Sequence, residues 1–225
     1  MKEKYLIIVG DGDFGQMAYD YFTYDSDYQV VGFAVERAFR KRSTLFGLPV
    51  VDFENVEDYF SPSNHEIFVA ITYVQLNRPR TRLYLESKHR GYNIASYVSS
   101  KAFCWRNVTI GENTFVFEGC ILQPYTKIGN NVILWSGTNI GHHSTVYDNC
   151  FFSSHVAVPG FCNIGPNCFI GVNATLADNV QIAKDCFICM GSIITKNTEE
   201  NKVYKGNPAI ATRVSAMEKM QVTET

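Results

Sequence analysis

The stretch NIGHHSTVYDNCFFSSHVAVPGFCNIG, residues 139–165, places an aliphatic or aromatic residue at every sixth position: 140, 146, 152, 158 and 164. The pattern extends in both directions from there. Fifteen consecutive positions, six residues apart from Ile110 to Ile194, are filled only by Ile, Leu, Val or Phe. A fixed short period of this kind predicts a repeat architecture rather than an ordinary globular core.

Two further columns accompany the aliphatic one. Two residues before each aliphatic position stands a small or β-branched residue: Val108, Thr114, Cys120, Thr126, Val132, Thr138, Ser144, Cys150, Val156, Cys162, Cys168, Ala174, Val180, Cys186 and Ser192. Three residues after many of them stands a residue that tolerates positive φ: Asn113, Gly119, Asn131, Gly137, Asn149, Asn167, Asn173, Asn179, Asp185, Gly191 and Asn197. Short strands broken by a turn at every hexad predict a parallel β-solenoid, with three hexads per 18-residue coil and about five coils over residues 108–197.

The cysteines follow from the same pattern. Five of the seven lie in the small-residue column, and a buried free cysteine packs as a small hydrophobe, so we expect inert wall residues. The seven cysteines include a single CxxC pair, Cys186 and Cys189, with no second such pair; their odd number argues against a disulfide framework, and we expect no zinc site.

Residues 1–104 show a different pattern. Three stretches read as strands, namely YLIIVG, QVVGFAV and EIFVAIT, and two read as helices, namely FGQMAYDYF and PRTRLYLESKHRG. These elements predict a small α/β domain with a parallel sheet. Gly10, Gly12 and Gly15 form GxGxxG between strand and helix, a spacing that lets backbone N–H groups approach a phosphate. Glu36 ends the second strand, where an acid would bind a ribose. About 100 residues supply only half of a doubly wound fold, which argues against a nicotinamide dinucleotide.

Charge and hydropathy exclude several classes. The 225 residues carry 20 basic and 22 acidic side chains, a net charge of −2, so we expect neither a nucleic acid nor a membrane partner. The apolar runs stop well short of the roughly 20 residues that a transmembrane helix needs, and we expect a cytoplasmic protein. The domains are predicted at 1–104 and 105–200, with a C-terminal tail over 201–225 that contains a short helix at AMEKMQ.

The tetrads IGEN, IGNN, IGHH and IGPN, each with a small residue two positions before its isoleucine, resemble the hexapeptide repeat of the left-handed β-helix acyltransferases. The resemblance implies an all-β left-handed parallel β-helix. It also implies a homotrimer with acetyl-CoA, as cosubstrate, in the groove between neighbouring prisms. The corresponding acetyl-CoA positions in this chain are Phe151, Gly160, Val172 and Met190.

The order of the two domains resembles the bacterial nucleotide-sugar N-acetyltransferases that acetylate 4-amino sugars. LFGLPVV at 45–51 and KGNPA at 205–209 match their signatures. The resemblance implies that the nucleotide of the sugar substrate contacts a small set of residues in the first domain, namely Gly10, Gly12, Asp13, Phe14, Gly15 and Glu36. The loop departs from the family's G-x-G-G-H-A, because this chain reads Gly12-Asp13-Phe14-Gly15.

The paired histidines are the candidate catalytic residues. The resemblance assigns the general base to His142, four residues before Val146, and an imidazole suits the removal of one proton from an attacking amine. An 18-residue coil puts Pro124 on one side of His142 and Gly160 on the other, and the glycine predicts a gap for the thioester. The residue after the base is usually acidic in the family. His143 stands there instead, and could bond the base, contact substrate, act as the base itself, or fill a positive-φ turn.

His155 holds a turn position on another edge, where it is either a turn residue or a contribution to a neighbouring chain's site. Three histidines also suggest a zinc site like that of the carbonic anhydrases with the same prism. The spacing of the zinc ligands in that family is absent from this sequence, and we expect no metal.

The chain is therefore predicted to acetylate the amino group of a nucleotide-linked amino sugar in bacterial surface-glycan synthesis, such as that of lipopolysaccharide O-antigen. The alternatives are a sugar O-acetyltransferase of the sialic-acid type and a non-catalytic β-solenoid scaffold. The sequence does not separate dTDP, UDP and GDP, nor the 3-amino from the 4-amino position.

Overall fold

The computed structural model describes residues 4–223 and divides the chain into two compact units. Residues 1–3 of the predicted first domain and 224–225 of the predicted tail lie outside the described residues. The first unit comprises Met1–Thr72 and Pro79–Tyr97, and the second comprises Tyr73–Arg78 and Val98–Thr225. A six-residue segment from within the first half of the chain, Tyr73–Arg78, thus belongs to the second unit.

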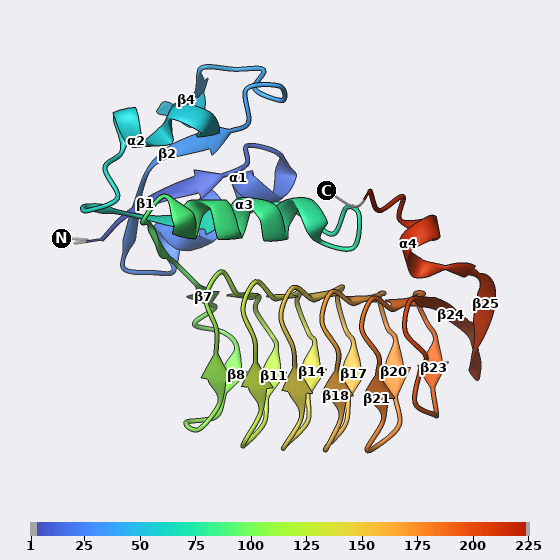
Figure 1. Cartoon of the computed structure of the whole chain (residues 1–225). Helices are drawn as coiled ribbons and strands as arrows, with labels where there is room; N and C mark the ends of the chain where they lie inside the picture. The colour runs from blue at the N-terminus through green and yellow to red at the C-terminus, as the bar shows by residue number, and fades with distance from the viewer. Residues whose placement is uncertain (1–3, 224–225) are drawn as a thin grey trace. The chain divides into compact units, whose positions relative to one another are not determined.

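The first unit is built on a six-stranded sheet of order β3-β4-β2-β1-β5-β6 (Figure 1). Its strands are β1 (Lys4–Val9), β2 (Tyr28–Val35), β3 (Thr44–Leu45), β4 (Leu48–Asp52), β5 (His65–Val69) and β6 (Asn93–Ile94). All neighbouring pairs are parallel except β3 with β4. Strands β1 and β5 end in the buried apolar runs LIIV and IFV, as is typical of the inner strands of a parallel sheet.

Helices connect these strands. They are α1 (Asp13–Tyr24), the 3-10 helix η1 (Phe53–Asn55), α2 (Val56–Tyr59) and α3 (Arg78–His89). The apolar residues Phe14, Ala18 and Phe22 of α1 are buried at helical spacing. The predicted α/β fold is confirmed, and the sequence reading missed the short β3, β4, β6, η1 and α2. Among the described residues, none of the helices has the length and apolar character that a membrane span requires.

The second unit is a three-faced prism of stacked coils (Figure 1). The first face contains β10 (Phe115–Val116), β13 (Ile133–Leu134), β16 (Phe151–Phe152), β19 (Phe169–Ile170) and β22 (Phe187–Ile188). The second contains β8 (Phe103–Cys104), β11 (Ile121–Leu122), β14 (Asn139–Ile140), β17 (Ala157–Val158), β20 (Thr175–Leu176) and β23 (Ile193–Ile194). The third contains β9 (Thr109–Ile110), β12 (Lys127–Ile128), β15 (Thr145–Val146), β18 (Asn163–Ile164) and β21 (Gln181–Ile182). Strand β7 (Tyr97–Val98) lies at the boundary of the two units.

The register confirms the predicted 18-residue coil, because Ile133 pairs with Phe151, and Phe151 with Phe169. Each of the fifteen predicted aliphatic residues is the second residue of a strand from β9 to β23. All are buried in one core except Ile110, which is partly buried against it.

The small-residue column forms a ladder of hydrogen bonds along the prism interior. Thr126, Ser144 and Cys168 donate to the carbonyls of Gly141, Pro159 and Ala183, each fifteen residues ahead. Cys120, Cys150 and Cys162 donate in the same way at 3.2–3.4 Å. The five column cysteines are buried, as predicted, and four of them take the place of serine and threonine in the ladder, whereas Cys186 donates to the Glu199 carbonyl.

Three corners join the faces, and a positive-φ residue stands at each turn from Asn113 to Gly191. The asparagine corner, between the third and first faces, holds Asn113, Asn131, Asn149, Asn167 and Asp185. The second corner, between the first and second faces, holds Gly119, Gly137, His155, Asn173 and Gly191. The histidine corner, between the second and third faces, holds Tyr125, His143, Phe161 and Asn179.

The prediction of a positive-φ turn at Asn197 was wrong. The regular coils end after β23, and the Asn197 side chain instead accepts a hydrogen bond from the backbone N–H of Gln181.

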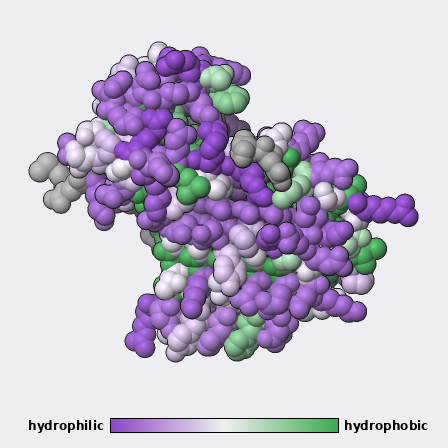
Figure 2. Space-filling view, in the orientation of Figure 1, coloured by the Kyte–Doolittle hydropathy of each residue, from purple (hydrophilic) through white to green (hydrophobic). Residues whose placement is uncertain are grey.

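The predicted C-terminal tail contains more structure than a single helix. Strand β24 (Lys202–Gly206) pairs with β22 and extends the first face, and β25 (Ala209–Ser215) pairs antiparallel with β24. The predicted helix is present as α4 (Ala216–Lys219), capped by the Ser215 hydroxyl. Ile210 and Val214 of β25 are exposed, and Figure 2 shows hydrophobic surface where Figure 1 places this strand.

Candidate functional site

The histidine corner places its aromatic residues one coil apart. The turns pair Pro124 with Tyr125, His142 with His143, and Gly160 with Phe161, and the second residue of each has a φ between 57° and 63°. Proline before a positive-φ residue is typical of a type II turn. A non-glycine residue in this conformation costs roughly 1–2 kcal/mol, which the surrounding coils must offset.

These positive-φ residues stack on one another along the prism. The ring of His143 lies 4.6 Å from that of Tyr125 and 5.1 Å from that of Phe161, with interplanar angles of 28° and 22°. The stack covers both faces of the His143 ring and leaves its edge exposed. Sequence analysis assigned no role to Tyr125 or Phe161, although both lie eighteen residues from His143 and the coil period could have found them.

His142 is exposed on this corner with its imidazole outside the prism core. Its backbone N–H donates to Gln123 Oε1 at 3.0 Å, which fixes the turn to the preceding coil. Its Nδ1 lies 3.2 Å from Nδ1 of His143, with the two rings nearly perpendicular. Because Nδ1 is engaged, Nε2 is the ring nitrogen left for a substrate proton.

Gly160 lies under the His142 ring, and the predicted gap beside the histidine is filled. A Cβ built on Gly160 would lie 2.7 Å from Cε1 and 2.8 Å from Nε2 of His142. The imidazole thus occupies the space over Gly160 within one chain, and the approach of a thioester beside this glycine stays a prediction. The missing side chain makes room for the imidazole itself.

The other predicted acetyl-CoA residues lie elsewhere on the prism. Val172 and Met190 precede the turn residues of the second corner and are 42% and 79% exposed. Phe151 belongs to the first face and is buried, with the Tyr73 ring 5.0 Å from its own. A single chain does not bring these three residues together with His142, and the burial of Phe151 gives no support to its groove-lining role.

His155 takes the turn conformation expected of it, with a φ of 57° at the second corner. Its ring lies over Gly137, whose built Cβ would be 2.3 Å from the His155 Nδ1. Within one chain, His155 and His142 therefore stand at different corners.

The three glycines of the first unit's loop have distinct surroundings. A Cβ on Gly15 would meet the Gly10 carbonyl oxygen at 2.2 Å, and one on Gly10, whose φ is +111°, would meet Ala70 O at 2.9 Å. Gly12 has open space around it and is the N-cap of α1, with no side chain capping the helix. Gly12 is thus the loop position where a ligand has access to helix N–H groups.

The remaining predicted nucleotide residues differ in accessibility. Asp13 is exposed in the first turn of α1, whereas Phe14 is buried against Phe68 and serves the core. Glu36 accepts from Arg82 at 2.9 Å. Arg42 pairs with Asp11 at 3.2 Å, which offsets the repulsion that this carboxylate would exert on a phosphate. Sequence analysis gave no role to Arg42 or Arg82.

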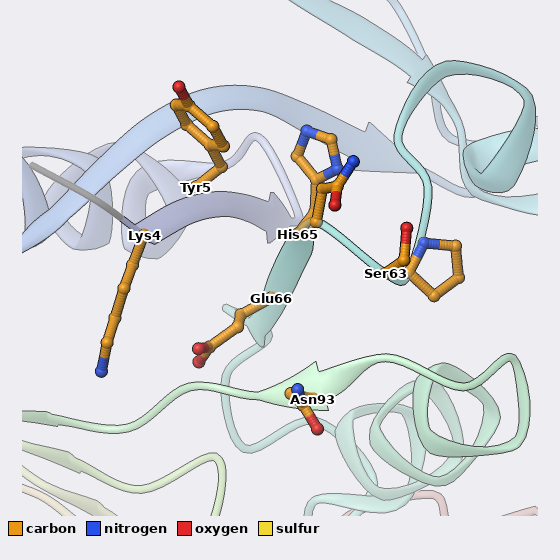
Figure 3. A pocket seen from close by; sticks show the side chains of 8 residues that line it. Lys4, Tyr5, Ser63, His65, Glu66 and Asn93 are labelled. Atoms are coloured by element: carbon orange, nitrogen blue, oxygen red, sulfur yellow. The ribbon is translucent and has the colours of Figure 1, made fainter.

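A hollow of the first unit, about 450 Å³ in volume, lies at the amino ends of β1, β5 and β6 (Figure 3). Lys4 and Glu66 extend to one side of the strands, and Tyr5 and His65 to the other. Tyr28 donates to Glu66 at 2.6 Å, and burial together with this bond raises the pKa of Tyr28. The glycine loop follows the carboxyl end of β1, where open α/β sheets bind ligands, so this hollow is not part of the candidate site.

The outward-facing residues differ among the three faces. The third face presents Thr109, Lys127, Thr145, Asn163 and Gln181, a polar surface. On the first face, Phe115, Ile133, Phe151 and Phe169 are all buried. The second face presents Phe103 and Ile121, which are 50% and 39% exposed, followed along the row by Asn139, Ala157, Thr175 and Ile193. Within residues 4–223, no group of three or more His, Cys, Asp or Glu is placed to hold a metal ion.

Comparison with known proteins supports the repeat and the fold. Residues 107–142 and 161–196 match the family model described as Bacterial transferase hexapeptide (six repeats). No curated protein matches the sequence.

Among solved structures, the acetyltransferase domain of PglB from Neisseria gonorrhoeae FA1090 is 20% identical, with 93% of this chain and 100% of that chain covered and a TM-score of 0.84. PerB from Caulobacter crescentus, solved in complex with CoA and GDP-perosamine, is 20% identical over 92% and 96% of the two chains, with a TM-score of 0.83. WeeI from Acinetobacter baumannii AYE is 20% identical over 93% and 100%, with a TM-score of 0.73. The fold is therefore an α/β unit followed by a left-handed parallel β-helix built from hexapeptide repeats, as predicted.

Proposed function

We propose that this chain is an acetyl-CoA-dependent N-acetyltransferase that acts on the amino group of a nucleotide-linked amino sugar, with His142 as the general base. The observation that carries the proposal is an exposed imidazole on a corner of a hexapeptide prism, with Nδ1 beside a neighbouring ring and Nε2 without a hydrogen-bond partner among residues 4–223. Solved neighbours of the same fold include acetyltransferases, one of them with CoA and GDP-perosamine bound.

The reaction needs one group that accepts a proton. The substrate amine forms a C–N bond to the acetyl carbonyl carbon and loses a proton, which His142 Nε2 takes up. The C–S bond then breaks, and the leaving thiolate takes a proton from the His142 imidazolium, which restores the neutral base. Acetyl-CoA supplies the activated acyl group, and the chain's own contribution is to hold the base at a fixed place on a rigid corner.

A homotrimer completes the proposed site. The second face carries the exposed apolar residues Phe103 and Ile121, whereas the third face is polar, so the second face is the one that gains most from burial. If three copies turn this face toward a common axis, the histidine corner of each meets the second corner of its neighbour. That arrangement sets His142 and Gly160 of one chain beside Val172, Met190 and His155 of the next, in a groove suited to acetyl-CoA.

The glycine loop is proposed to hold the nucleotide. Gly12 and the uncapped start of α1 offer N–H donors to a diphosphate, Gly10 and Gly15 shape the loop, and Asp13 borders it. Glu36, on the neighbouring strand end, is proposed to contact the ribose, for which its bond to Arg82 must open. We further propose a cytoplasmic role in bacterial surface-glycan synthesis, where such nucleotide sugars are consumed.

The test is thiol release from acetyl-CoA with a panel of dTDP-, UDP- and GDP-linked sugars bearing a 3-amino, a 4-amino or only hydroxyl groups. We expect turnover with an amino sugar and a loss of at least about 100-fold in kcat for His142→Ala. His89→Ala in the same assay is the control for an exposed histidine outside the proposed site, and it should keep its activity. Turnover with hydroxyl sugars alone would indicate an O-acetyltransferase, and no turnover with any sugar would indicate a scaffold.

A further inference from the structure

We propose that His143 is the positioning residue of the base. In this arrangement its neutral imidazole accepts a hydrogen bond at Nδ1 from the Nδ1–H of His142, so that the two rings hold opposite tautomers. The inference deepens the proposed function, because it says how the Nε2 lone pair of His142 is kept facing the substrate.

The contact between the rings requires that one Nδ1 is protonated and the other is not. The two Nδ1 atoms lie 3.2 Å apart, and a hydrogen bond across them needs a proton on one and a lone pair on the other. If His142 carries the shared proton, its Nε2 is unprotonated and can act as a base. If His143 carried it, Nε2 of His142 would hold a proton and the base would be lost.

The stack on the histidine corner holds the acceptor in place. Tyr125 and Phe161 cover the two faces of the His143 ring, so the ring cannot turn about its bond to Cβ without breaking both contacts. Phe161 also contacts the His142 ring edge to face, with the centroids 4.9 Å apart. Neither imidazole has a carboxylate partner among the described residues, so the orienting group on this corner is the second imidazole.

The neighbouring coils suggest variants that separate a hydrogen-bonding role from a packing role. The positive-φ position of this corner is occupied by Tyr125, Phe161 and Asn179 in other coils, so Phe and Asn are both compatible with its backbone. His143→Phe keeps the stack and removes the acceptor nitrogen. His143→Asn keeps an acceptor oxygen, suits a positive φ and removes the aromatic ring.

The two variants have opposite expected outcomes. If His143 positions the base, His143→Phe lowers kcat by about 10- to 100-fold with KM nearly unchanged, and His143→Asn keeps most of the activity. If His143 only packs the corner, His143→Phe is active and His143→Asn is impaired, and that result would overturn the proposal. Thermal unfolding of both variants checks that the prism is intact.

A measurement without substrate separates this proposal from the proposed function. Nitrogen-15 NMR of the full chain, which has only five histidines, reports the protonated nitrogen of each ring, and His142→Ala and His143→Phe assign the signals. We expect a protonated Nδ1 and an unprotonated Nε2 on His142, and the reverse on His143. The same tautomer on both rings would refute the pair even in an active enzyme. Opposite tautomers in a chain that releases no thiol would leave the pair standing and refute the acetyltransferase.

Discussion

Replacing Gly160 with alanine should impair the proposed catalysis while leaving the prism folded. The added Cβ would lie 2.7 Å from Cε1 and 2.8 Å from Nε2 of His142, where ordinary contacts begin at 3.4 Å. The ring must therefore move by about 0.7 Å. Displacements near 1 Å at a reacting centre cost about 100-fold, so we expect kcat/KM to fall by roughly 10- to 100-fold, or about 1.4–2.7 kcal/mol of transition-state stabilisation.

The backbone should accept this alanine without strain. The φ of Gly160 lies outside the left-handed region, and Pro124, His142 and Asp178 hold the same position in other coils. A glycine-to-alanine change at a compatible site stabilises a protein by about 0.4–1 kcal/mol through the unfolded chain, so the free energy of unfolding should hold or rise slightly. Activity and stability should thus move in different directions.

The assay pairs thiol release with urea unfolding. Asp178→Ala is the control, since it changes the same turn position one coil further on, away from the His142 ring. Full turnover by Gly160→Ala would show that the position of the His142 ring does not matter. A large loss of stability would show that Gly160 is needed for the turn rather than for the imidazole.

Three further predictions concern the prism itself. Burial raises the pKa of the Cys120 thiol to about 11 from 9.0, so its contribution to stability is complete below pH 9 and is lost as the pH rises through 11. Urea unfolding should accordingly show that the free energy of unfolding falls less at alkaline pH in Cys120→Thr, whose hydroxyl can replace the thiol in the ladder. Asp185→Asn introduces the residue that the other coils have at this corner and removes the 2.6 Å ion pair with Arg78, so the free energy of unfolding should fall by about 1–2 kcal/mol. Asn167→Ala, at the same corner one coil earlier, should leave that pair intact. If the chain forms the proposed trimer, Ile121→Lys on the second face should convert it to a monomer in light scattering, and Lys127→Ala on the third face should not. A trimer that survives Ile121→Lys would remove this face from the interface.

The prism was predictable because its period is written in the sequence. Each coil needs an inward aliphatic residue and a small residue two positions earlier, and no distant contact decides either choice. The same period identified the turns, including those of His143 and His155. It failed at Asn197, where the last coil has no following coil to hold the turn.

The detail of the corner could not be predicted in the same way. Spacing placed Gly160 beside His142, but only rotamers decide whether a ring or a ligand fills the space above a glycine. The Nδ1 to Nδ1 contact depends equally on side-chain torsions, which a one-dimensional pattern does not contain. In the first unit, Arg42 and Arg82 reach Asp11 and Glu36 from loops and helices distant in sequence, and such ion pairs leave no local signal.

The segment 73–78 makes the connection between the two halves of the chain more than a single peptide link. Gln75, Leu76 and Asn77 all have positive φ, Asn77 donates to Asn149 O at 2.7 Å, and the Tyr73 ring contacts Phe151 and Phe169. A chain truncated to begin near residue 98 would therefore lose this segment from the solenoid, and Phe151 and Phe169 would become exposed on its first face. An isolated solenoid made in that way should be prone to aggregate. The first unit of such a protein can be exchanged for another only together with the segment 73–78.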